Sequence, residues 1–292
     1  MNQHPTRPTP IAAAVLAQLA AVAERWPSPK VRRLHIPQRP GEPGEHDAEF
    51  CAIELDDGAF GLSYILLGHT LDRLLAAHGS GRSNAFAGAD PMALAQRLIG
   101  GDEVERAVAL AAINALTDSV WRRVGYQPPP AGNSLGDVVL GPQDHLGMIG
   151  FFPPLVQRVD EAGGRLTVVE MNAAMVARQQ ERFPKVHITL DRAQLAACNT
   201  VVGTSTMLLN DTLDQMLAAA PAATRFAVIG PSAGLWPDAL FERGVTLLGG
   251  TQVVDGAAFA EAMAAGESWS GASRKFAISR QGWPGWRQIT GR

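Results

Sequence analysis

Short apolar segments alternate with amphipathic helical segments from residue 145 to residue 265, and this alternation constrains the fold more than any other feature of the chain. Strands separated by helices in this way predict a parallel sheet that helices cover on both faces. Because crossovers between parallel strands are right-handed, we expect an α/β domain with a Rossmann-like, doubly wound topology. The predicted strands are 145–150, 166–170, 186–189, 200–202, 225–229 and 245–248. The predicted helices are 154–162, 173–183, 212–220, 238–243 and 257–265.

The first 125 residues are organised differently and predict a compact α+β domain. A loose tail of ten residues leads into a predicted helix, which Pro27 and Pro29 end. Asp56-Asp57-Gly58 predicts a turn between two strands, because its glycine suits a positive φ. The predicted elements are a helix at 11–25, strands at 31–37, 49–55 and 60–67, a loop at 41–46, and helices at 92–99 and 103–116.

Three consecutive prolines mark the boundary between the two parts. The segment Tyr126-Gln-Pro-Pro-Pro-Ala-Gly-Asn133 cannot continue a helix or a central strand, because proline fixes φ and removes the backbone donor. We therefore expect an α+β domain at 1–125, a linker at 126–140 and a ligand-binding Rossmann-like domain at 141–292.

Charge and cysteine content limit the classes of partner. The net charge of −3 argues against nucleic acid, because phosphate binding needs a concentrated basic surface. Cys51 and Cys198 lie far apart and favour buried, reduced thiols over a disulfide. No apolar run approaches the roughly 18 residues of a membrane span. We expect a cytoplasmic protein with a small-molecule ligand and without a membrane partner, and we leave a homodimer open.

The first strand-to-helix turn is a candidate ligand contact, because open parallel sheets bind ligands at the carboxyl ends of their strands. Its glycines, Gly147 and Gly150, let the backbone approach a ligand, although they equally suit tight strand–helix packing. Phe151 and Phe152 follow, and on an extended segment one ring would enter the core while the other faces the cleft. The turn lacks the G-x-G-x-x-G fingerprint, which disfavours a nicotinamide-dependent oxidoreductase.

Polar residues follow the later strands. Glu170 ends the second strand, where Rossmann folds bind ribose hydroxyls, although an exposed strand end is the alternative. Asp191 follows the third strand and is either a contact at the adenine end or a helix N-cap. Thr204 and Ser205 place hydroxyls and backbone N–H groups near a helix start, as a carboxylate or phosphate site requires. Ser232 supplies a further hydroxyl after the fifth strand.

Two other chemistries are disfavoured. Gly230-Pro-Ser-Ala-Gly234 has the form of a nucleophile elbow, but the last histidine, His187, comes too early in the chain for a hydrolase of this kind. No histidine pair has metal-ligand spacing, so we expect no metal site, with a cluster of His35, His69 and Cys51 as the weak alternative. We expect His145 to be a structural histidine.

The C-terminal segment 268–292 contains three tryptophans. A lid or a subunit contact are alternatives, and we favour packing of this segment on its own domain.

Several motifs resemble the heavy-metal chelation domain family. The resemblance covers most of the chain and implies an N-terminal domain similar to the enolase N-terminal fold, followed by a Rossmann-like domain. It also implies a site between the domains, with Tyr64 and Asn114 turned towards Phe151, Thr204 and Ser232, although the sequence offers no ligand cluster for a metal. The motifs are Phe60-Gly-Leu-Ser-Tyr64, Ala111-Ala-Ile-Asn114, Gly147-Met-Ile-Gly-Phe-Phe-Pro-Pro-Leu155, Gly203-Thr-Ser-Thr with Asn210-Asp-Thr212, Gly230-Pro-Ser232, and Gly249-Gly250 through Asp255.

The chain is also similar in size and domain order to Rossmann-like enzymes that cyclise S-adenosylmethionine to azetidine-2-carboxylate with release of methylthioadenosine. This resemblance implies that Glu170 holds the ribose. Aromatic rings such as those of Tyr64, Phe151 and Phe152 would face the sulfonium. The hydroxyls of Thr204, Ser205 and Ser232 would hold the carboxylate, and Asn114 would orient the amine.

The function expected from the sequence is therefore that of an S-adenosylmethionine-binding enzyme, with this cyclisation or another alkyl transfer as its reaction. The alternative is a non-catalytic protein that binds heavy metal or a metal chelate.

Overall fold

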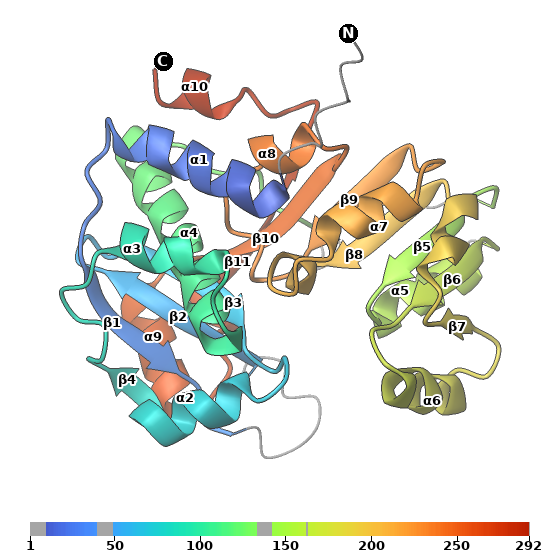
Figure 1. Cartoon of the computed structure of the whole chain (residues 1–292), viewed down its shortest axis with the longest axis horizontal. Helices are drawn as coiled ribbons and strands as arrows, with labels where there is room; N and C mark the ends of the chain where they lie inside the picture. The colour runs from blue at the N-terminus through green and yellow to red at the C-terminus, as the bar shows by residue number, and fades with distance from the viewer. Residues whose placement is uncertain (1–9, 40–48, 133–141, 162, 292) are drawn as a thin grey trace, which may run out of the picture.

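The computed structural model describes residues 10–39, 49–132, 142–161 and 163–291 (Figure 1). The predicted N-terminal tail, the loop at 41–46 and the linker residues 133–140 lie outside this part of the chain. The structure is a mixed α/β fold with an N-terminal α+β part and a C-terminal Rossmann-like sheet, as predicted.

The N-terminal part is built on a four-stranded antiparallel sheet in the order β3-β2-β1-β4. Gly58 adopts a φ of 80° in the turn between β2 and β3, which confirms the predicted turn. The helix α2 and the strand β4 were not predicted. The strands are β1 (Val31–Ile36), β2 (Phe50–Leu55), β3 (Phe60–Tyr64) and β4 (Gly81–Ser83). The helices are α1 (Ile11–Ala23), α2 (Thr70–His78), α3 (Pro91–Ala95) with the 3-10 turn η2 (Gln96–Leu98), and α4 (Glu103–Val124).

The long helix α4 packs against β2 and β3. A capping box of Asp102 and Glu105 begins it, and Gly125 ends it in the left-handed conformation. The sequence prediction ended this helix at residue 116, near Thr117 and Asp118. That prediction was wrong, because these polar residues are buried and bonded: Thr117 Oγ1, for example, donates to the Ile113 carbonyl at 2.9 Å.

A glycine allows α4 to lie this close to the sheet. A Cβ on Gly61 of β3 would clash with the backbone of Ala111 and Ala115 on α4. The contact between helix and strand is therefore backbone against backbone, which only glycine permits at this position.

The C-terminal part contains a seven-stranded sheet in the order β11-β10-β9-β8-β5-β6-β7. Its strands are parallel except β11, which pairs antiparallel with β10. The sequence prediction missed β11, in which Phe276 and Ile278 alternate with more exposed residues. The strands are β5 (His145–Ile149), β6 (Arg165–Val169), β7 (His187–Thr189), β8 (Thr200–Thr204), β9 (Arg225–Ile229), β10 (Leu247–Val253) and β11 (Ser273–Ser279). The helices are α5 (Pro153–Glu161), α6 (Ala173–Arg182), η3 (Arg192–Ala197), η4 (Ser205–Leu208), α7 (Leu213–Ala219), α8 (Asp238–Phe241), α9 (Gly256–Ala265), η5 (Ser270–Ala272) and α10 (Trp286–Ile289).

The two parts interlock through segments from the end of the chain. Helix α9 packs against β1 and β4 of the N-terminal sheet (Figure 1). The rings of Phe60 and Phe259 meet edge to face, with centroids 5.4 Å apart, and join β3 to α9. Residues of β2, β3, α9 and the segment after it form one apolar cluster. The C-terminal part therefore covers an apolar face of the N-terminal sheet.

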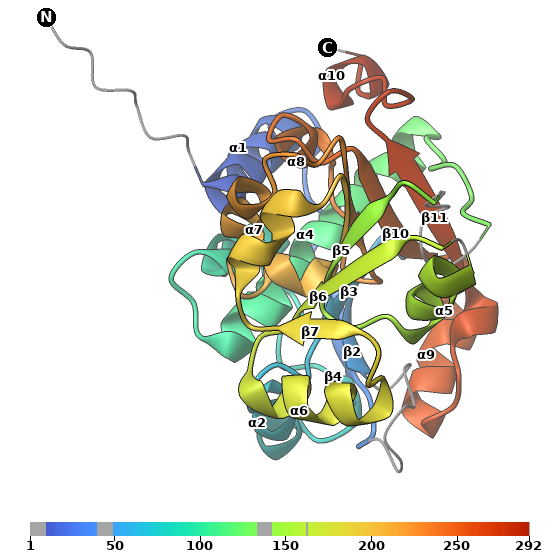
Figure 2. The ribbon, with the colours of Figure 1, turned by 90° about the vertical axis from the view of Figure 1, so that its right-hand side faces the viewer.

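The C-terminal segment packs on the same chain, which confirms the favoured prediction for it. The backbone N–H of Trp286 in α10 donates to Asp238 Oδ1 of α8 at 3.1 Å. Arg25, just after α1, donates to the Gly291 carbonyl at 2.8 Å. Figures 1 and 2 both show α10 above α1 and α8.

Candidate functional site

The carboxyl ends of β5, β6 and β8 meet at one edge of the large sheet. The strand order reverses between β5 and β8, which is the position where open α/β sheets bind ligands. Ile149 of β5 is paired with Val169 of β6 and with Gly203 of β8. The next residues along these strands, Gly150, Glu170 and Thr204, therefore lie together, and we call them the switch-point edge.

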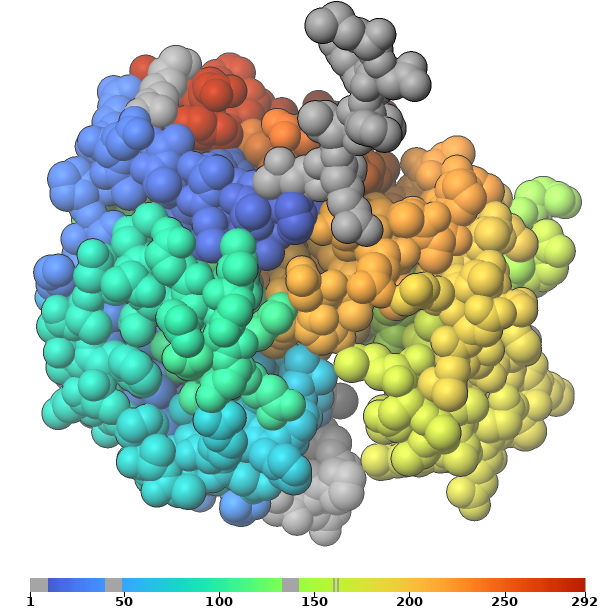
Figure 3. Space-filling view, in the orientation of Figure 1, coloured from blue at the N-terminus to red at the C-terminus, as the bar shows by residue number. Residues whose placement is uncertain are grey.

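The outer surface is hollowed beside this part of the molecule. Figure 3 shows the hollow between the residues coloured cyan, which belong to the N-terminal part, and those coloured yellow-green to yellow, which belong to the first half of the large sheet and its helices. Figure 1 shows β5 and β6 running towards that hollow.

Glu170 is the most unusual side chain at the switch-point edge. It is 7% exposed, and its Oε1 atom is buried without a hydrogen-bond partner among the described residues. Its Oε2 atom accepts one long bond from the Met171 N–H, at 3.4 Å. Burial raises the pKa of this carboxyl above its usual range, and the Met171 N–H offsets the shift only in part. The exposed-strand-end alternative for Glu170 is therefore wrong, since a carboxylate with a free acceptor oxygen lies in a nearly dry position.

The turn from β5 into α5 offers few backbone donors. Pro153 and Pro154 occupy the first two helical positions and carry no N–H. The next N–H, that of Leu155, donates to the Phe152 carbonyl at 2.9 Å. The Gly150 N–H donates to the Val169 carbonyl at 3.0 Å. The Phe152 N–H donates to Met148 Sδ at 3.3 Å, and among the described residues the Phe151 N–H makes no hydrogen bond. The first helical turn of α5 therefore offers no free N–H group to a phosphate, and Phe151 supplies the free donor that precedes it.

The two phenylalanines of this turn both pack on the apolar cluster of the large sheet, and both are half-buried. The Phe151 ring lies against the Phe183 ring with centroids 4.8 Å apart. The expectation that one ring is core and the other faces the cleft is not reproduced, because α6 supplies a second packing surface at Phe183. Both residues keep part of their surface exposed.

Gly147 lies inside β5, away from the turn. A Cβ there would come within 2.8 Å of Leu195 Cδ2 and 3.1 Å of Cys198 Sγ. This confirms the packing interpretation for Gly147. Gly150 differs, because its φ of 77° and its place beside Thr204 put it at the edge itself.

The hydroxyl-rich loop after β8 is folded on itself. Thr204 Oγ1 accepts the Thr206 N–H at 3.3 Å and caps the short helix η4. Ser205 is buried beside Gly230, where any Cβ would clash with the Ser205 hydroxyl. Thr204, which is half-buried, is the hydroxyl of this loop that reaches the switch-point edge.

Ser232 and Asn114 form a joint between the two parts of the molecule. The Tyr64 N–H donates to Ser232 Oγ at 2.9 Å. The Asn114 side-chain amide donates to the Leu62 carbonyl at 2.7 Å and to the Ser232 carbonyl at 2.8 Å. Ser232 is 0% exposed, so in this arrangement it has no surface with which to hold a ligand. Ser232 meets both Tyr64 and Asn114, as the resemblance implied, but through hydrogen bonds that join the two parts of the molecule. The implied approach of Tyr64 and Asn114 to Phe151 and Thr204 stays a prediction.

Asp191 caps the helix η3, where its Oδ1 accepts the Ala193 N–H at 3.0 Å. This confirms the N-cap alternative for Asp191. His145 is also structural, as expected, because Nδ1 contacts the Ala197 carbonyl at 3.1 Å and Nε2 contacts Thr167 Oγ1 at 2.9 Å.

The described residues contain no group of three or more histidine, cysteine or acidic side chains placed to hold a metal ion. The weak alternative of His35, His69 and Cys51 does not form. His35 is buried and contacts Glu54 Oε2 at 2.8 Å, whereas the His69 side chain is 84% exposed. Within the described ranges, no helix is long and apolar enough to cross a bilayer.

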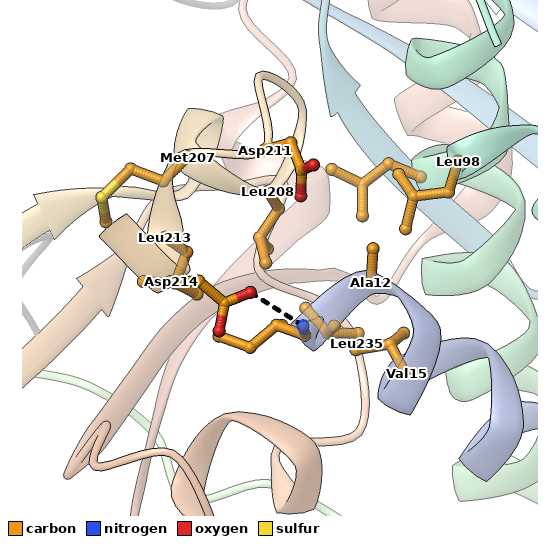
Figure 4. Close-up of a pocket in the computed structure, with 11 residues that line it drawn as sticks. Ala12, Val15, Leu98, Met207, Leu208, Asp211, Leu213, Asp214 and Leu235 are labelled. Atoms are coloured by element: carbon orange, nitrogen blue, oxygen red, sulfur yellow. Dashed lines mark hydrogen bonds between the residues drawn. The ribbon is translucent and has the colours of Figure 1, made fainter. Parts of the chain in front are cut away.

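A second hollow lies at the junction of α1, η2 and the segment from η4 to α7 (Figure 4). It is mainly apolar, and sequence reasoning missed it because its walls come from distant parts of the chain. Two acidic residues line it, Asp211 and Asp214. Asp214 is occupied: Oδ2 accepts the Ile11 N–H at 2.9 Å, and Arg243 donates to Oδ1 at 3.3 Å. This hollow is therefore part of the packing between α1 and α7.

These features define a two-part α/β protein with a Rossmann-like sheet and a solvent-facing edge at its switch point. A family profile described as "putative heavy-metal chelation" matches residues 135–280, which is half of the chain, and a second profile with the same description matches residues 48–117. The chain belongs to this family.

Two solved structures of the family have the same fold. A protein of unknown function from Pyrococcus horikoshii aligns with a TM-score of 0.66 and 17% identity, covering 92% of this chain and 99% of that one. A protein of unknown function from Desulfitobacterium hafniense aligns with a TM-score of 0.65 and 20% identity, again covering 92% and 99% of the two chains. No curated protein matches the chain.

Proposed function

We propose that the protein binds a small ligand that carries a ribose, with S-adenosylmethionine as its substrate or cofactor, at the switch-point edge. The observation that carries the proposal is the unpartnered Oε1 atom of Glu170. A buried acceptor without a donor costs about 1–3 kcal/mol, and a ligand hydroxyl would remove that cost. The position is the one at which Rossmann folds bind the ribose diol of a nucleoside.

A bound diol would also change the ionisation of Glu170. Burial raises the pKa of Glu170 in the free protein because the ionised form lacks donors. Two hydroxyls donating to the carboxylate would favour the ionised form and make charge-assisted hydrogen bonds.

Within this proposal the sharpest reaction is the intramolecular cyclisation of S-adenosylmethionine. The amine nitrogen attacks the γ-carbon, the bond from that carbon to the sulfonium breaks, and its electron pair neutralises the sulfur. The products are azetidine-2-carboxylate, methylthioadenosine and a proton from the amine. Because the leaving group is already activated, the protein has mainly to orient the amine and exclude water. Another alkyl transfer from the same substrate would use the same binding site.

Phe151 and Phe152 directly follow Gly150 of the switch-point edge. Their aromatic rings would face the sulfonium. Each such contact contributes roughly 0.5–2 kcal/mol. Thr204 is the hydroxyl that would hold the amino-acid carboxylate. The role proposed for the buried residues is to hold the loops after β8 and β9 in place without touching the ligand. These residues are Ser205, Ser232 and Asn114.

Calorimetry with S-adenosylmethionine tests the proposal. Glu170→Gln keeps the shape of the side chain and removes the charge, so we expect about tenfold weaker binding. Glu181→Gln on the exposed face of α6 is the matched control and should bind as the wild type does. Absence of binding to the wild type, or equal binding by Glu170→Gln, would refute the proposal.

The family description favours a second function, the binding of heavy metal. Because the described residues offer no set of three metal ligands, the form of this function that they support is the binding of a metal already held by a small chelator. Elemental analysis of the purified protein, followed by thermal shift with metals and metal chelates, tests it. A metal-free protein with no thermal shift would exclude this second function.

A further inference from the structure

The start of helix α5 lacks the donors that phosphate recognition uses. In an ordinary helix the first N–H groups have no partner within the helix and point towards a ligand. Here Pro153 and Pro154 remove two of them, the Phe152 carbonyl accepts that of Leu155 at 2.9 Å, and the Phe152 N–H donates to Met148 Sδ at 3.3 Å. The donors of the first helical turn are therefore either missing or occupied.

The position of this helix matters because it follows the first strand of a Rossmann-like sheet. The pyrophosphate of a dinucleotide lies at the N-terminus of that helix, held by backbone N–H groups and the helix dipole. A phosphate placed at the start of α5 would meet two prolines without N–H groups, with the Phe151 N–H as the free donor before them. Burying an ionised group without donors is strongly unfavourable.

Glu170 provides a second, independent reason for this site to favour a hydroxyl-bearing group over a phosphate. Its carboxyl lies at the end of the adjacent strand, where β5 and β6 are joined by the bond from the Gly150 N–H to the Val169 carbonyl, 3.0 Å long. A hydroxyl-bearing group relieves the free Oε1 atom, whereas a phosphate near the carboxyl would be repelled once Glu170 is ionised.

We infer that Pro153 and Pro154 are specificity-determining residues, which restrict the switch-point edge to nucleosides whose 5′ carbon carries an uncharged or cationic group in place of phosphate. This inference rests on the proposed function, since it names the ligand class of the same site. The 5′-thioethers and 5′-sulfonium nucleosides belong to this class, and nucleotides and dinucleotides do not.

Competitive calorimetry with two adenosine derivatives tests the inference. The probes are 5′-methylthioadenosine and adenosine 5′-monophosphate, which share base and ribose and differ at the 5′ position. We expect the wild type to bind the thioether at least about tenfold more tightly. Pro153→Ala/Pro154→Ala restores two N–H groups at the start of the helix and should reduce this preference about tenfold, through tighter binding of the monophosphate.

Pro184→Ala, at the exposed end of α6, is the control and should leave the preference unchanged. Equal binding of both probes to the wild type would overturn the inference and leave the proposed function standing. An unchanged preference in the double variant, with thioether binding retained, would also overturn it. Should the double variant fail to fold, the wild-type comparison still tests the ligand class, since equal binding overturns it, and failure of the wild type to bind either probe would refute the proposed function itself.

Discussion

The backbone N–H of Tyr64 donates to the hydroxyl of Ser232 across the joint between the antiparallel and parallel sheets, at 2.9 Å. Ser232 belongs to the loop after β9, and Tyr64 is the last residue of β3. Ser232→Ala would leave this N–H without its acceptor in a half-buried position. We expect a loss of about 1–3 kcal/mol in the free energy of unfolding, measured by urea denaturation.

Ser273→Ala is the control for this prediction, because the Ser273 hydroxyl makes an exposed bond of 3.3 Å to the Ser270 carbonyl. We expect it to change stability by less than about 0.5 kcal/mol. Equal effects of the two substitutions would contradict a structural role for Ser232 in the joint.

Gly61→Ala should be far more disruptive than its size suggests. The added methyl group would collide with the backbone of α4, which cannot move without displacing much of the buried face of that helix. We expect a loss of more than about 3 kcal/mol, or an insoluble product. Gly271→Ala is the matched control, because it has open space around the new methyl group and an ordinary φ. Thermal unfolding of the two variants gives the comparison.

Asp118 of α4 makes hydrogen bonds to β3 and β10, and its replacement should lower the stability of the fold. It accepts hydrogen bonds from Arg122 Nε and Gln252 Nε2, each 2.7 Å, and from the Phe60 N–H at 3.2 Å. Asp118→Ala would leave the buried Phe60 N–H, the half-buried Gln252 amide and the exposed Arg122 without this acceptor, so we expect a loss of about 1–3 kcal/mol. Asp56→Ala removes an acid whose side chain is 57% exposed and should cost less than about 1 kcal/mol. Chemical denaturation of both variants tests the difference.

Glu170 should make the free protein less stable as pH rises. Burial raises its pKa in the folded state, so the folded protein binds this proton more tightly than the unfolded chain does. Between the unfolded and the folded pKa the native state carries more protons, and stability therefore falls through that window as pH increases. Glu170→Gln should be more stable than the wild type at neutral pH, and this difference should shrink as pH falls through that window and disappear below pH of about 4.

Urea denaturation of wild type and Glu170→Gln across this pH range measures the effect, with Glu181→Gln as the control. A constant difference between wild type and Glu170→Gln at all pH values would show that the carboxyl is not desolvated in solution. A saturating nucleoside ligand should reduce the dependence, since its hydroxyls favour the ionised form.

The parallel sheet was predictable because each of its strands is apolar and is followed by a helix with one apolar face. The place of Glu170 was predictable for the same reason, since a residue that ends a parallel strand lies at the ligand-binding edge. Neither required knowledge of contacts between distant residues.

The role of Ser232 was not predictable from its loop. Its hydroxyl is occupied by Tyr64, which is distant in sequence, and a local pattern contains no information on such a partner. The end of α4 was predicted wrongly for the same reason. The polar residues Thr117 and Asp118 indicate a helix end when their hydrogen-bond partners in the fold are not known. The strand β11 was missed because its alternation is short and lies in a segment rich in tryptophan and glycine.

Helix α9 completes the surface of a sheet that is synthesised some two hundred residues earlier. Phe50 and Phe60 are covered by Phe259, Met263 and Trp269, so on the ribosome the N-terminal sheet would expose this apolar face until the end of the chain emerges. The two halves of the chain are therefore poor candidates for separate expression. A fragment ending near residue 130 would expose an apolar surface that favours aggregation. We therefore expect the first half to complete its folding only after α9 has been synthesised.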